Sequence, residues 1–166
     1  VDKSTSESDP YKERIEKEIK IYQHKREMDA VTDEEYYNFL KLKLAEYEQY
    51  ATKYEEEIWD LKQEIFNGQR EMLDDWVDDQ QKAAERVAMT GNIEGQLDIY
   101  RGVIDRMKKE LDEAYTYGLD ANSDYVQNLE AKIRDAAKSI LDITKSVFDD
   151  FISYADDFNR WDNFGK

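Results

Sequence analysis

The chain has 166 residues, of which 24 are basic and 40 acidic, so its formal net charge is −16. Nucleic acids and anionic membrane surfaces are bound mainly through Lys and Arg, and both would repel a chain of this charge. The lack of cysteine excludes disulfides, thiolate nucleophiles and Cys-ligated metals. Charged residues make up 39% of the chain, with one Pro and six Gly, which is typical of long helices or coiled coils.

The first predicted elements are a polar arm and a short helix. Residues 1–9 are Ser-rich and offer little to bury, so we expect a disordered arm. Asp9 and Pro10 then predict a helix start, because Asp is a good N-cap and Pro fits the first helical turn. The helix is predicted over residues 10–30.

The next helix start has the strongest local signal. Thr32 and Glu35 have the spacing of a capping box. Apolar residues then recur in alternating steps of four and three, which predicts one long helix over residues 31–90 with a heptad seam. Gly68 makes 67–68 a candidate kink, because Gly in a helix costs about 1 kcal/mol relative to Ala. The predicted packing seam of this helix comprises Leu40, Leu44, Tyr47, Tyr54, Ile58, Leu61 and Ile65.

Aromatic residues widen the apolar face of this long helix beyond a single seam. A wider face indicates packing against more than one neighbour. Five aromatic residues are therefore candidate interface residues toward another helix or subunit, with packing inside the same fold as the favoured alternative. These residues are Tyr36, Tyr37, Phe39, Trp59 and Phe66.

Residues 91–161 predict a helical hairpin, and residues 162–166 a short tail. Gly118 can supply a left-handed C-terminal cap, Ser123 can cap the following helix, and the short connection favours antiparallel neighbours. The fold class is thus all-α, with long antiparallel helices in a coiled coil or an elongated helical bundle. The predicted seam of the hairpin comprises Leu97, Tyr100, Ile104, Leu111, Leu129, Ile133, Ile140, Val147 and Phe151.

The residues that carry chemistry form no convincing site. His24 is the only histidine and lies among polar neighbours. Asp120, Asn122 and Asp124 match the first ligand positions of a calcium-binding EF-hand loop, but the Gly and the bidentate Glu that such a loop needs are missing, so helix capping is the better interpretation. We therefore expect no enzyme, no cofactor and no metal. A small helical enzyme or metal protein is the weakest alternative.

Three phrases in order give a more specific signal. They are Tyr117–Leu129 (YGLDANSDYVQNL) after QLDIY at 96–100, Thr32–Tyr37 (TDEEYY) followed by Leu40, and the ending Phe148–Asn159 (FDDFISYADDFN). Together they cover most of residues 32–161. The chain resembles the helical segments of tail tape measure proteins from phages and prophages of Gram-positive bacteria.

The resemblance implies a structural, non-enzymatic function. Tape measure proteins lie in the tail lumen after synthesis in the bacterial cytoplasm, and their length sets tail length. The resemblance also implies association with further copies of the chain and with tail tube or tail tip proteins, without nucleic acid or membrane. The chain does not begin with Met, and we expect it to be part of a longer protein. The alternative is a coiled-coil scaffold or adaptor that binds partner helices.

Overall fold

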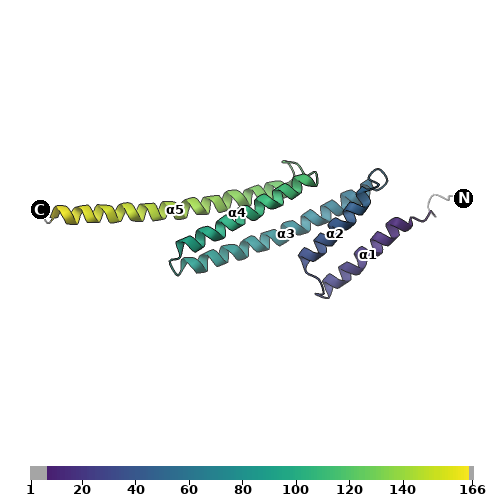
Figure 1. Cartoon of the computed structure of the whole chain (residues 1–166), viewed down its shortest axis with the longest axis horizontal. Helices are drawn as coiled ribbons and strands as arrows, with labels where there is room; N and C mark the ends of the chain where they lie inside the picture. The colour runs from purple at the N-terminus through teal and green to yellow at the C-terminus, as the bar shows by residue number, and fades with distance from the viewer. Residues whose placement is uncertain (1–6, 165–166) are drawn as a thin grey trace. The chain divides into compact units, whose positions relative to one another are not determined.

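A computed structural model describes residues 7–164, with side chains described through residue 160. The helices are α1 (Pro10–Glu27), α2 (Asp33–Glu48), α3 (Glu55–Ala88), α4 (Ile93–Thr116) and α5 (Asp124–Phe164) (Figure 1). No strand occurs among these residues, so the all-α prediction is confirmed. The chain divides into two compact units, Val1–Leu73 (unit 1) and Asp74–Lys166 (unit 2), and α3 contributes residues to both.

The first two helices begin where the capping signals predict. The Asp9 carboxylate accepts a hydrogen bond from the Lys12 backbone N–H at 3.1 Å, and Pro10 is the first helical residue. The Thr32 hydroxyl accepts one from the Glu35 N–H, also at 3.1 Å. Residues 1–6 of the predicted arm lie outside the described residues.

The prediction of one helix over residues 31–90 is wrong, because α2 ends at Glu48 and α3 begins at Glu55. The turn between them is held by the Tyr54 N–H, which donates to the Tyr50 carbonyl at 3.2 Å. Tyr47 and Tyr54 are both buried, and their ring centroids lie 4.9 Å apart across the turn. The heptad steps continue through the break because residues on either side of it face the same core.

The kink predicted at 67–68 is also absent, since α3 is helical through both residues. A Cβ atom placed on Gly68 would lie 2.0 Å from Cζ and Oη of Tyr37. Glycine is therefore required here by the close approach of a ring from α2, and not by a bend in the helix.

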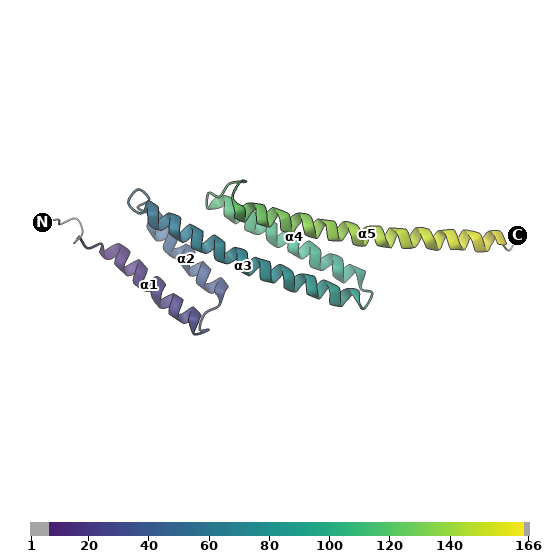
Figure 2. The same cartoon turned by 180° about the vertical axis from the view of Figure 1, so that it is seen from behind.

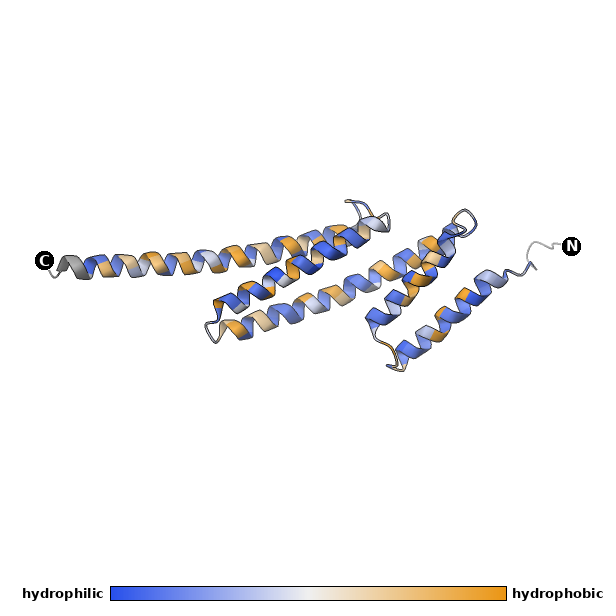
Figure 3. Ribbon diagram, viewed as in Figure 1, coloured by the Kyte–Doolittle hydropathy of each residue, from blue (hydrophilic) through white to orange (hydrophobic). Residues whose placement is uncertain are grey.

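Unit 1 joins α1, α2 and the first part of α3 around one apolar core. Its fully buried side chains come from all three helices: Ile15 from α1, Tyr36, Leu40, Leu44 and Tyr47 from α2, and Ile65 and Leu73 from α3. Figure 3 shows apolar residues recurring among polar ones along each helix. This amphipathic pattern lets each helix bury one face.

Unit 2 contains the predicted hairpin, which is confirmed: α4 and α5 pack side by side in both views (Figures 1 and 2). Gly118 has φ of 86°, as a left-handed cap requires, and Ser123 Oγ accepts from the Val126 N–H at 3.3 Å. α5 has 41 residues and α4 has 24, so α5 runs on past the end of its partner. α5 also continues to Phe164, so the predicted tail at 162–166 is wrong for its first three residues, and 165–166 lie outside the described residues.

Candidate functional site

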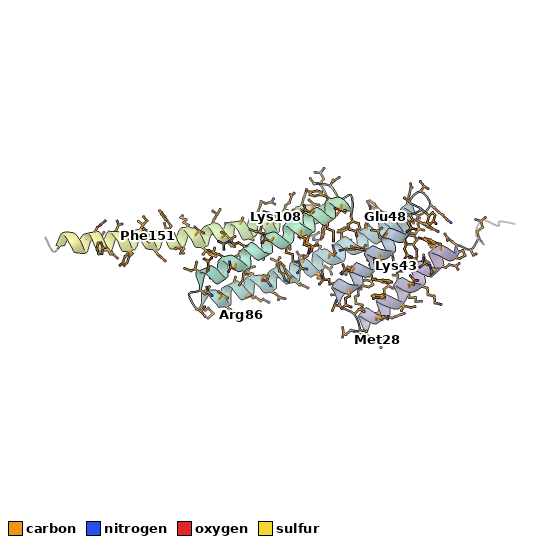
Figure 4. All side chains as sticks on the ribbon, in the orientation of Figure 1. Met28, Lys43, Glu48, Arg86, Lys108 and Phe151 are labelled. Carbon is orange, nitrogen blue, oxygen red and sulfur yellow. The ribbon has the colours of Figure 1, made fainter. Side chains whose placement is uncertain are left out.

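The second half of α5, most of which runs past α4, carries an uncovered apolar surface. We call residues 141–160 the α5 overhang. Phe151 is 64% exposed and Tyr154 is 70% exposed, whereas Leu129 near the start of the same helix is fully buried. Figure 4 shows the Phe151 side chain on a stretch of α5 with no other helix of unit 2 beside it. Seven of the fifteen exposed large apolar side chains of the described residues lie here: Leu141, Val147, Phe148, Phe151, Ile152, Tyr154 and Phe158.

The predicted seam residues fall into three groups by burial. Leu40, Leu44, Tyr47, Tyr54, Leu61, Ile65 and Leu129 are buried. Ile58, Leu97, Tyr100, Ile104, Leu111, Ile133 and Ile140 are half-buried. Val147 and Phe151 are exposed, so their predicted packing role is not met by any described part of this chain. The reason is length, because the apolar stripe of α5 outlasts α4.

Two of the five candidate interface residues belong to the core of unit 1. Tyr36 is fully buried and Phe66 is 4% exposed, so both pack inside the fold, as the favoured alternative predicts, and neither offers a surface to another subunit. The Tyr36 hydroxyl donates to Glu64 Oε1 at 2.8 Å, and the Arg26 guanidinium carbon lies 4.0 Å from its ring centroid. Burial raises the pKa of Tyr36 to about 12.

Two further candidates pack against α1. Tyr37 Oη accepts a hydrogen bond from Arg26 at 3.2 Å, and Phe39 stacks on Tyr22 with ring centroids 3.8 Å apart. Both rings are half-buried. Trp59 is 63% exposed, so its role as an interface residue stays a prediction.

A charged cluster links α1 to α2 in unit 1. Lys43 pairs with Glu18 and, at 2.9 Å, with Glu46, which also accepts from Arg14 at 2.9 Å. The hydrogen bond from Lys43 lowers the pKa of Glu18. Burial opposes the ionised form of Glu46, but hydrogen bonds from Lys43 and Arg14 outweigh it and lower its pKa. These ion pairs connect α1 to α2, so the cluster acts as a structural link between the two helices.

Unit 2 contains an open groove of about 670 Å³ between α3, α4 and α5. Lys132 lies in it and pairs with Asp74 from α3. Carboxylates outnumber ammonium groups along its walls, so the groove is acidic. Its lining residues are Asp74, Val77, Asp78, Gln81, Tyr100, Val103, Lys132, Asp135, Ala136, Lys138, Ser139 and Asp142.

The polar side chains at the α4–α5 connection accept hydrogen bonds from backbone N–H groups. Asp120 Oδ1 accepts from the Asn122 N–H at 2.8 Å, as expected for a turn that precedes a helix.

His24 Nδ1 lies 3.4 Å from Glu27 on an exposed surface. Within residues 7–160, no group of three or more His, Cys, Asp or Glu side chains is placed to hold a metal ion. None of the described helices is both long and apolar enough to cross a membrane.

Comparisons with family models, with curated proteins and with solved structures find no match to this chain. Its function must therefore be inferred from its own surfaces. The predicted seam did not include Val103, although this residue of α4 is only 2% exposed and lies in the buried part of the hairpin. The α5 overhang is the surface that its own unit leaves uncovered, and it is the candidate functional site.

Proposed function

We propose that this protein is a non-enzymatic structural protein that works through helix–helix packing, and that it is a segment of a phage tail tape measure protein. The α5 overhang carries the first part of the proposal. A contiguous stripe of large apolar side chains on a water-exposed helix favours association, because covering it removes apolar surface from water.

The tape measure assignment is supported by the three sequence phrases and by where they fall in the fold. Thr32–Tyr37 begins α2, Tyr117–Leu129 spans the connection from α4 to α5, and Phe148–Asn159 lies within the α5 overhang. On this proposal the segment lies in the tail lumen of a virion. Its partners are further copies of the chain, or tail tube or tail tip proteins.

The hairpins change how such a segment would measure length. A continuous helix adds about 1.5 Å per residue. The turns at 49–54 and 117–123 reverse the chain within each unit, so a folded segment adds less length than its residue count implies. The folded units, rather than single residues, would be the increments of this ruler.

Gene position and tail length test the assignment. The gene should lie beside tail-tube and tail-tip genes. In-frame deletion of residues 74–166 should shorten the tails seen by electron microscopy, whereas Gly102→Ala, an exposed helical site with open space around it, should leave them unchanged. Tails of unaltered length after the deletion would overturn the ruler function.

The second candidate is a coiled-coil scaffold or adaptor that binds partner helices. It is favoured by the closed core of unit 1, which has the character of a local folded domain. A gene far from any tail gene, in a chain whose α5 overhang still binds helices, would support this candidate over the tape measure.

A further inference from the structure

The α5 overhang has an apolar stripe with carboxylates along one of its edges. Val147, Phe151, Tyr154 and Phe158 follow steps of four, three and four, which are the core positions of a heptad seam. At about 100° per residue, Asp150 and Asp157 flank this stripe on one edge, one heptad apart.

A second acidic pair lies away from the stripe. Asp149 and Asp156 are also one heptad apart, but helical geometry puts them on the opposite side of α5. Residues 141–160 contain five Asp, one Lys and one Arg, so the net charge of the overhang is −3. An occupant of this face must therefore match a carboxylate edge as well as an apolar stripe.

A second copy of the chain does not supply that match. In an antiparallel pair the Asp150 edges of the two helices would face each other, which is repulsive. In a parallel pair, the heptad register would place Asp150 opposite Ala155 of the other copy, which offers no positive charge. The net charge of −16 on each copy adds to the repulsion.

The acidic edge continues into the groove of unit 2. Ser139 lines that groove, and Asp150 and Asp157 follow it by eleven and eighteen residues, which brings all three to nearly the same side of α5. Asp135 and Asp142 also line the groove. A helix lying along this side of α5 would meet carboxylates over the whole distance.

We infer that the α5 overhang docks a basic amphipathic helix, with apolar residues at heptad core positions and Lys or Arg along the edge that faces Asp150 and Asp157. The inference rests on the proposed function and names the chemistry of its partner. The apolar stripe supplies the contact area, and the charged edge sets the choice and register of the partner, as edge charges do in coiled coils.

Two synthetic helical peptides of three heptads test this inference on the full chain. Both have Leu and Ile at core positions; one has Lys along its edges and the other has Glu. Fluorescence anisotropy at low salt should show the Lys peptide binding at least about tenfold more tightly, with the difference shrinking as salt is added. Phe151→Asp should abolish binding of the Lys peptide.

The matched variants separate edge recognition from net charge. Asp150→Lys with Asp157→Lys should reverse the preference between the peptides. Asp149→Lys with Asp156→Lys makes the same change in charge on the opposite side and should preserve the preference. Equal effects of the two double variants would overturn the inference.

Self-association separates failure of the inference from failure of the proposed function. Sedimentation that shows a dimer abolished by Phe151→Asp, with no preference between the peptides, would mean that a second copy covers the overhang; helix packing would stand and the basic partner would not. An overhang that binds neither peptide nor a second copy would overturn both.

Discussion

In unit 1 the buried stripe of α2 ends close to the end of the helix, whereas in unit 2 the apolar stripe of α5 continues long after its last buried residue, Ala136. Both units are built from a helical hairpin and a part of α3. A similar architecture thus gives a buried core in unit 1 and, in unit 2, a seam whose last part is exposed. The difference lies in helix length, because the amphipathic pattern is the same in kind.

The core of unit 1 and the α5 overhang also differ in how polar groups accompany their aromatic rings. In unit 1, Tyr36 bonds to Glu64 and the Tyr54 hydroxyl donates to Asp9 at 3.0 Å, so buried rings are tied at their polar ends. Phe151 and Phe158 in unit 2 have no polar end to tie. Buried aromatic rings whose hydroxyls are hydrogen-bonded hold one packing arrangement. Exposed rings without a hydroxyl are suited to a contact that forms on binding.

The largest expected effect contrasts two predicted seam residues of α5. Leu129→Ala removes a fully buried side chain and should destabilise unit 2 by about 2–5 kcal/mol. Phe151→Ala should change stability by no more than about 0.5 kcal/mol, because its ring is exposed. Urea unfolding followed by circular dichroism at low protein concentration measures both. A large loss for Phe151→Ala would show that the overhang is covered in solution.

The next effect contrasts two helical glycines. Gly68→Ala puts a methyl group into the Tyr37 ring and should destabilise unit 1 by about 1–3 kcal/mol, since overpacking outweighs the gain in helix propensity. Gly102→Ala in α4 meets nothing within 4 Å and should stabilise by about 1 kcal/mol. Adding Tyr37→Ala to Gly68→Ala should restore part of the loss. A stabilising Gly68→Ala would contradict the close approach.

Periodicity and capping chemistry predicted most of the helical structure. Asp9, Thr32 and Ser123 cap helices as their residue types indicate. Periodicity missed the break at 49–54, because a turn that returns the chain to the same core preserves the spacing from Tyr47 to Tyr54. The run Glu55–Glu57 is the signal that could have located it, since acidic residues favour the first turn of a helix.

The open part of the site was beyond prediction from spacing alone. Val147 and Phe151 have the same heptad steps as Leu129 and Ile133, and spacing identifies an apolar face without saying what covers it. The length mismatch was visible in the sequence, because the stripe after Ser123 is longer than the one before Gly118. Comparing those two lengths would have predicted an overhang.

A third prediction uses alkaline pH, which should weaken unit 1. Burial raises the pKa of Tyr36 and of Tyr47 to about 12 from an ordinary value of 10. Because the folded state holds these protons more tightly, their contribution is complete below pH 10 and is lost as pH rises toward 12. Each should remove about 1 kcal/mol by pH 11.

Unfolding in urea at pH 9 and pH 11, with tyrosinate absorbance as a second signal, measures this loss. Tyr36→Phe should reduce it by about 1 kcal/mol, the contribution of Tyr36, while the raised pKa of Tyr47 continues to weaken unit 1. An unchanged loss in the variant that replaces both Tyr36 and Tyr47 by Phe would show that other groups cause the alkaline weakening.

The prediction with the smallest expected effect concerns a cation–π contact in unit 2. The Arg106 guanidinium carbon lies 4.6 Å from the Trp76 ring centroid, with Nε 3.8 Å from Glu110. Arg106→Met should cost about 0.5–1 kcal/mol, because a cation over an indole ring is attracted to its face. Arg101→Met on the same helix removes only exposed ion pairs and should cost less.

Tryptophan fluorescence during urea unfolding, in a background where the other two Trp are Phe, reports on Trp76 directly. A shifted emission for Arg106→Met and none for Arg101→Met would place a fixed clamp between α3 and α4 in the closed part of unit 2. Equal behaviour of the two variants would mean that Trp76 is held by apolar contacts alone.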